Sequence, residues 1–108
     1  MPVDEISYLV LQLFDANPVR SQRSLARELG VSLGKVNYCV KALVRRGWVK
    51  VRNFRDSGNK AAYMYLLTPR GMEHKGKLTV QFLQRKVEEY EALGMEIRRM
   101  RRQAGLGK

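Results

Sequence analysis

A short run of polar and basic residues has the types and spacing to contact nucleic acid. Lys35, Asn37, Tyr38 and Lys41 fall on the polar side of a helix expected from about Leu33 to Arg46. Lysine can donate to guanine O6 or N7, and asparagine can pair with adenine N6 and N7. Tyr38 and Lys41 lie further along and are placed to reach a phosphate or a thymine methyl. Together these side chains suit the DNA major groove.

The residues around the start of this helix suit a phosphate backbone. Ser32 is expected to cap the helix, Leu33 begins it, and Gly34 has no side chain to hold DNA away. An earlier helix begins at Ser21, and amides at a helix N-terminus commonly bind phosphate. Three arginines near that helix are candidates for backbone contact, although solvated surface charge explains them nearly as well: Arg20, Arg23 and Arg27.

Hydrophobic periodicity defines the elements that must position these groups. Apolar residues at helical spacing predict a first helix over 4–16, followed by helices over 21–30 and 32–46. Two alternating or aromatic runs around a basic, glycine-bearing turn predict a hairpin over 48–67. A C-terminal helix is expected over 69–104, with a flexible tail at 105–108. The predicted fold class is mainly α with a small β-hairpin (α+β).

The expected core follows from the same patterns. The first helix has an apolar stripe at Ile6, Leu9, Val10, Leu13 and Phe14. The second helix buries Leu25, Ala26 and Leu29. Glycine, valine and serine at 30–32 predict a tight turn, with glycine ending one helix and serine capping the next. The inner face of the third helix is predicted to comprise Val36, Cys39, Val40, Leu43 and Val44.

The C-terminal helix carries an apolar seam close to a heptad repeat, which predicts dimerisation. A single helix of this length cannot bury the seam against its own small domain. The pattern leaves open whether Gly76 or Gly94 breaks the helix and whether two such helices pair parallel or antiparallel. The residues of the seam are Leu83, Val87, Tyr90, Leu93, Ile97 and Met100.

Composition narrows the function class. The 108 residues carry a formal net charge of +11, and the excess peaks at 17–50, which indicates a polyanionic partner. The single cysteine excludes an internal disulfide and fits a reducing cytoplasm. There is no membrane-length apolar run and no secretory signal pattern. No catalytic, cofactor or metal-ligand motif is found, so we expect neither an enzyme nor a cofactor.

These motifs resemble the winged helix-turn-helix domain of bacterial regulators, and most closely the MarR family. The resemblance covers about residues 5–80 and rests on the stretches 24–32, 36–43, 46–49 and 67–71. It implies that 33–46 is the recognition helix and that 49–67 is the wing, whose basic tip corresponds to Arg52, Arg55 and Lys60. It also implies that Leu33, Gly34, Lys35, Asn37, Tyr38 and Lys41 face DNA.

The chain is also similar to short MarR-like regulators found beside exopolysaccharide biosynthesis genes. The resemblance implies a homodimer on double-stranded DNA, with two recognition helices on a roughly palindromic operator, acting by default as a repressor. Two departures are notable: Lys60 stands where an arginine is usual, and there is room for only one long or bent helix after the wing. The second departure puts the family's usual ligand pocket in doubt, and any small-molecule effector is unknown.

Other function classes remain open at this point. A winged helix can serve as a protein-interaction module whose basic face binds an acidic protein, or as a nonspecific architectural DNA binder. A peripheral membrane or coiled-coil adaptor is a further alternative, because the arginines at 98–102 suit anionic lipid. Sequence preference for duplex DNA and co-sedimentation with vesicles discriminate among these classes.

Overall fold

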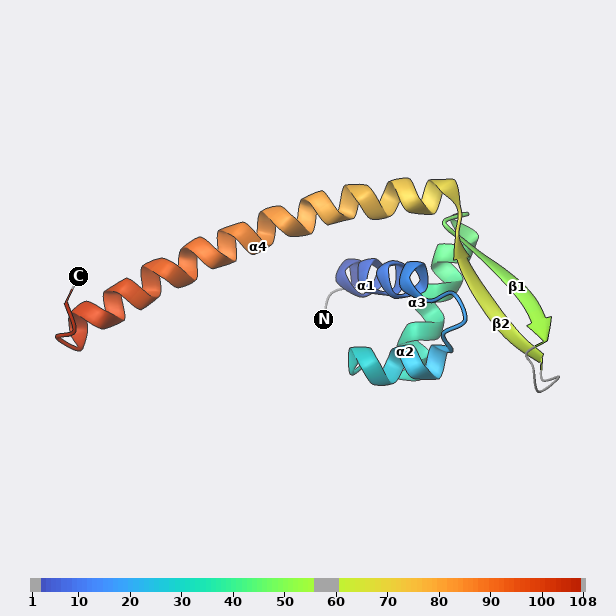
Figure 1. The fold of residues 1–108 in the computed structure, drawn as a ribbon, viewed down its shortest axis with the longest axis horizontal. Helices are drawn as coiled ribbons and strands as arrows, with labels where there is room; N and C mark the ends of the chain where they lie inside the picture. The colour runs from blue at the N-terminus through green and yellow to red at the C-terminus, as the bar shows by residue number, and fades with distance from the viewer. Residues whose placement is uncertain (1–2, 56–60, 108) are drawn as a thin grey trace. The chain divides into compact units, whose positions relative to one another are not determined.

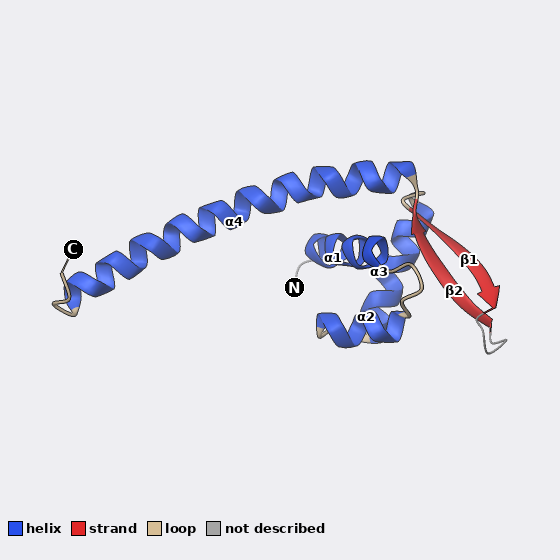
Figure 2. Ribbon diagram, in the orientation of Figure 1, coloured by secondary structure: helices blue, strands red, loops and turns tan. Residues whose placement is uncertain are grey.

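The computed structural model describes residues 3–55 and 61–107, with side chains described over 5–53 and 62–107. The elements follow in the predicted order (Figures 1 and 2). They are α1 (Val3–Ala16), α2 (Gln22–Leu29), α3 (Leu33–Arg45), β1 (Val49–Arg55), β2 (Ala61–Leu67) and α4 (Pro69–Gln103). The predicted fold class, mainly helical with a hairpin and a long C-terminal helix, is therefore confirmed.

The chain divides into two compact units, residues 1–76 and 77–108, and α4 runs through the division. The helix is continuous through both Gly76 and Gly94, which answers the question that the sequence left open. The N-terminal unit contains α1, α2, α3 and the hairpin, and therefore every residue predicted to contact DNA.

Helix α1 contributes large apolar side chains to the core. Ile6, Val10, Leu11 and Phe14 are fully buried. Leu11 lies outside the predicted stripe, whereas the predicted Leu9 and Leu13 are only half-buried. The buried face is wider than one stripe because α1 packs against α2, α3 and β2. The ring of Phe14 stacks on Tyr65 of β2, with ring centroids 4.6 Å apart.

Caps fix the two helices that follow. The hydroxyl of Ser21 accepts a hydrogen bond from the amide of Ser24 at 3.0 Å, and that of Ser32 accepts one from Lys35 at 3.1 Å. Gly30 ends α2 in the left-handed conformation at φ 68°, which glycine adopts without strain. Because these three residues are caps, both helices are shorter than the predicted spans of 21–30 and 32–46.

Helix α3 presents a narrower apolar face to the core than predicted. Val36, Cys39, Val40 and Leu43 are buried, as the pattern indicated. Val44 is 38% exposed, so its place on the inner face was wrong. It lies one residue beyond Leu43, and a step of 100° around the helix turns its side chain toward the hairpin instead of α1.

The hairpin is an antiparallel pair in which Val49 faces Leu67 and Arg55 faces Ala61. Cross-strand pairing places Val51, Tyr65 and Tyr63 on one face, because side chains alternate along a strand. The segment after α1 is hydrogen-bonded to β2: the amide of Tyr65 donates to the carbonyl of Pro18 at 2.8 Å. This bond fixes the base of the hairpin against the helices.

The exit from the hairpin is held by Thr68. Its hydroxyl donates to the carbonyl of Gly47 at 2.5 Å and accepts from the amide of Gly71 at 3.0 Å, which caps α4. Gly71 is buried against the main chain of Trp48: a Cβ placed at Gly71 would lie 1.9 Å from the carbonyl oxygen of Trp48. Only glycine fits this approach.

Candidate nucleic-acid interface

The exposed side of α3 forms a continuous stripe along the helix. Gly34, Tyr38, Lys41 and Arg45 follow one another at intervals of four, three and four residues, so they share one face. That face is opposite the buried residues of the same helix. It combines an aromatic ring with two cations, which can meet base edges and phosphates in a groove. Arg45 was not among the predicted site residues, although its spacing from Lys41 is a helical repeat.

Lys35 lies to one side of this stripe and is exposed. Leu33 lies to the other side and is 44% exposed. The structure therefore leaves the predicted reading residues Leu33, Gly34, Lys35, Tyr38 and Lys41 accessible on α3. Whether they contact DNA remains a prediction.

Asn37 has a different environment from the one predicted. Its amide nitrogen donates to the side-chain oxygen of Gln22 at 3.2 Å, and the amide nitrogen of Gln22 donates to the hydroxyl of Tyr65 at 3.1 Å. This chain of hydrogen bonds links α3 to α2 and β2. Asn37 is half-buried and already bonded within the protein, so it helps to hold α3 against its neighbours.

A hollow of about 700 Å³ lies between the starts of α2 and α3 and the strand β2. Tyr63 and Tyr65 form its wall on the hairpin, and Leu33, Gly34 and Asn37 form its wall on α3. Tyr63, Tyr65 and Asn37 also line an adjoining hollow of about 380 Å³, which extends along α3 to Lys41 and Arg45. A groove thus runs between α3 and the hairpin.

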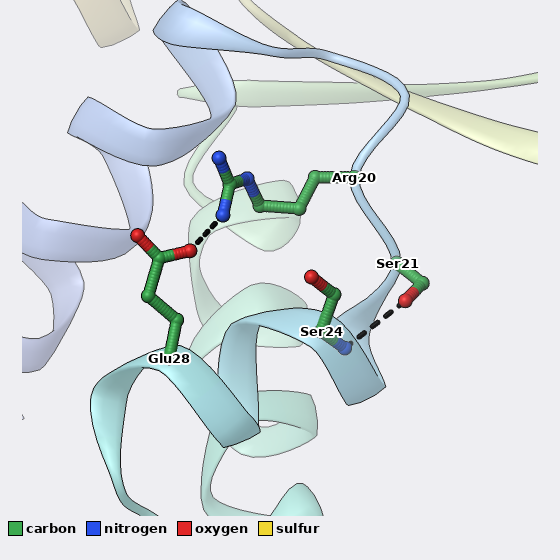
Figure 3. A network of polar contacts seen from close by, with 4 residues as sticks. All are labelled: Arg20, Ser21, Ser24 and Glu28. Carbon is green, nitrogen blue, oxygen red and sulfur yellow. Dashed lines mark hydrogen bonds and ion pairs between the residues drawn. The ribbon is translucent and has the colours of Figure 1, made fainter.

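The start of α2 is the second region that was predicted to contact DNA, and Figure 3 shows the polar contacts around it. The hydroxyls of Ser21 and Ser32 are engaged as helix caps. Arg20 forms an ion pair with Glu28, which partly neutralises the charge of the arginine. Arg23 and Arg27 are exposed and stay candidates for phosphate contact.

The hairpin carries the remaining predicted contacts. Arg52 is exposed on β1. The side chain of Arg55 and the whole of Lys60 lie outside the described residues. Tyr63 is 59% exposed on the face that looks toward α3. It lies opposite Asn53, two residues nearer the turn of the hairpin than the buried Tyr65.

Cys39 has no features of a reactive thiol. Burial raises the pKa of its thiol above the ordinary value, and a hydrogen bond with Ser7 and the charge of Lys35 oppose that effect. A raised pKa keeps the thiol protonated and unreactive, which agrees with the predicted core role. Over residues 3–55 and 61–107, no group of histidine, cysteine and acidic side chains could hold a metal ion. No helix in that part of the chain is long and apolar enough to cross a membrane.

Comparison with known proteins agrees with this architecture. Residues 3–50 match the sequence model of a family described as winged helix-turn-helix DNA-binding. No curated protein sequence matches the chain. Among solved structures, smu.1704 from Streptococcus mutans UA159 superposes with a TM-score of 0.69 at 19% identity, covering 79% of this chain and 82% of that one.

Two solved regulators extend the comparison. The transcriptional regulator BldR from Sulfolobus solfataricus gives a TM-score of 0.61 at 25% identity, over 79% of this chain and 58% of BldR. FabT of Streptococcus pneumoniae, whose structure was solved in complex with DNA, gives 0.54 at 21%, over 77% of this chain and 56% of FabT. This chain thus spans little more than half the length of these two proteins.

The fold is similar to that of MarR-family regulators. In that fold the hairpin β1–β2 is the wing. The chain is therefore a winged helix-turn-helix protein that is similar to DNA-binding transcriptional regulators.

Proposed function

We propose that this protein is a sequence-specific regulator of transcription that binds double-stranded DNA through α3 and the wing. The observation that carries the proposal is the exposed stripe of α3, which places Tyr38, Lys41 and Arg45 in line on the face opposite the core. A winged helix presents this helix to the major groove and its hairpin to the adjoining backbone or minor groove. The net charge of +11 supplies the general attraction to phosphate.

The test is a titration against the duplex just upstream of the gene and against a shuffled duplex of equal length, at about 0.15 M salt. True regulators prefer their sites by about a thousandfold or more. We therefore expect the protein to bind the native duplex at least about a hundredfold more tightly than the shuffled duplex. The threshold is set lower because the duplex is not trimmed to the exact binding site. Equal affinity for both would contradict the proposal and favour the alternative, a nonspecific architectural or protein-interaction module.

We further propose that the functional unit is a homodimer formed through α4. Six apolar side chains follow the length of this helix beyond Gly76 and are between 44% and 78% exposed. An exposed apolar seam of this extent marks an interaction site. Its spacing suits a second helix of the same kind. The six residues are Leu83, Val87, Tyr90, Leu93, Ile97 and Met100.

Replacing Leu93 and Ile97 by glutamate should convert the dimer into monomers. Two carboxylates in the middle of a paired apolar seam would be desolvated without partners, which is costly. Sedimentation equilibrium measures the change. A matched control replaces the exposed Glu88 and Arg99 by alanine, which leaves the seam intact and should leave the dimer unchanged. A double-glutamate variant that stays dimeric would place the interface elsewhere.

A dimer would bring two recognition helices to successive major grooves about 34 Å apart on a roughly palindromic operator. Repression by occupying a promoter is the mode that the resemblance to MarR-like regulators supports. The similarity to short regulators encoded beside exopolysaccharide genes makes such genes the first candidates for regulated targets. Action on chromosomal DNA implies a cytoplasmic protein.

A further inference from the structure

The first two turns of α3 have an apolar surface within an otherwise basic face. Leu33 is 44% exposed and Tyr38 is 63% exposed. Between them lies Gly34, where an added Cβ would meet no described atom within 4 Å. Two exposed apolar side chains thus flank an open position, which we call the apolar notch: Leu33, Gly34 and Tyr38.

A leucine and a tyrosine that are exposed together would gain free energy if an apolar group of a partner covered them. The charges around the apolar notch indicate the chemistry of that partner. Lys41 and Arg45 continue the same stripe beyond Tyr38, and Lys35 flanks it on one side. A partner that satisfies these cations is polyanionic and must also offer small apolar groups on its surface.

Duplex DNA carries one such group. In the major groove each A·T pair presents the 5-methyl of thymine, whereas a G·C pair has no methyl group at the equivalent position. Side chains on a helix lean toward its N-terminus, so Tyr38 leans toward the turn that contains Gly34. The notch is therefore open at the end of the helix that enters the groove first.

We propose that the apolar notch reads thymine methyl groups and that apolar contact selects A·T pairs at this point of the operator. The proposal rests on the proposed DNA-binding function. Asn37, the residue best suited to pair with adenine, donates to Gln22 inside the protein. Base selection by α3 thus depends more on contact with thymine methyl groups than on paired hydrogen bonds from the Asn37 amide to adenine.

Deoxyuridine tests the proposal because it differs from thymidine at the major-groove edge only by the missing methyl group. The native duplex is compared with the same duplex carrying deoxyuridine throughout the footprint. Burial of one methyl corresponds to about a fourfold change in affinity. We expect the wild-type protein to bind the uracil duplex about fourfold more weakly for each methyl contacted.

Two variants assign the effect to the notch. Leu33→Ala removes one wall, and Gly34→Ala fills the open position with a methyl of its own, so both should bring the ratio between the two duplexes close to one. Gly34→Ala keeps the fold, because its Cβ meets no described atom within 4 Å and alanine favours helix over glycine. Lys41→Gln is the control: it should weaken binding to both duplexes equally and preserve the ratio.

The outcomes separate the two proposals. Equal binding of native and shuffled duplexes overturns the DNA-regulator function and methyl reading with it. A strong preference for the native duplex combined with no loss on uracil substitution overturns methyl reading alone. A loss that persists unchanged in both Leu33→Ala and Gly34→Ala also overturns it, because the methyl contact would then lie outside the notch.

Discussion

Gly71→Ala should unfold the domain or lower its free energy of unfolding by about 3 kcal/mol or more, at the upper end of overpacking effects. The new Cβ would lie 1.9 Å from the carbonyl oxygen of Trp48 and 2.9 Å from its carbonyl carbon. Both are main-chain atoms, so no side-chain rotation relieves the overlap. Moving them would also disturb the amide of Thr68, which donates to the same carbonyl of Trp48 at 3.1 Å. Urea denaturation followed by circular dichroism measures the loss.

Gly76→Ala is the matched control, because the same change is made in the same helix. A Cβ at Gly76 meets no described atom within 4 Å. Alanine is favoured over glycine inside a helix by up to about 1 kcal/mol, so this variant should be as stable as the wild type or more stable. A Gly71→Ala protein that denatured at the same urea concentration as the wild type would contradict the close packing of α4 on Trp48.

Reversing two charges on the recognition stripe should have the largest effect on DNA binding. In Lys41→Glu with Arg45→Glu, two cations of the exposed stripe become anions that repel phosphate. We expect affinity for the native duplex to fall by about a hundredfold or more. The slope of log affinity against log salt should become shallower by about one unit for each phosphate that the variant no longer neutralises. Both residues are exposed, so the urea midpoint should stay close to that of the wild type.

A second double variant, Lys50→Glu with Arg70→Glu, changes the net charge by the same amount at other exposed positions. Lys50 lies on the face of the hairpin opposite to Tyr65, because its neighbour Val51 is the residue that pairs with Tyr65. This variant should bind specific DNA much more tightly than the stripe variant. Equal losses would mean that total charge, and not the stripe on α3, governs binding.

The parts of the structure that local chemistry determines could be predicted from the sequence. Ser21, Gly30 and Ser32 set helix ends through bonds to residues a few positions away, so the helix-turn-helix was predictable in type and place. The same holds for the threonine and proline that begin α4. The alternation at 48–52 predicted a half-buried strand, and β1 begins one residue later, at Val49.

What could not be predicted depends on residues that are far apart in the chain. Leu11 is buried because α1 touches three other elements, which a single helical stripe does not reveal. The bond between Asn37 and Gln22 and the bond between Gln22 and Tyr65 join three elements. The exposure of Tyr63 depends on the register of the hairpin, which composition does not specify. DNA contact by the candidate residues stays a prediction.

The bond between Tyr65 and Pro18 has a consequence for the order in which the protein folds. Tyr65 also stacks on Phe14 and accepts from Gln22, so one residue of β2 completes the packing of two helices that precede it by more than forty positions. A nascent chain that has emerged only as far as residue 50 contains all three helices but lacks this tyrosine. Distant contacts of this kind slow folding. Because Gln22 also accepts a hydrogen bond from Asn37, helix α3 gains its full set of contacts only after synthesis has passed the wing.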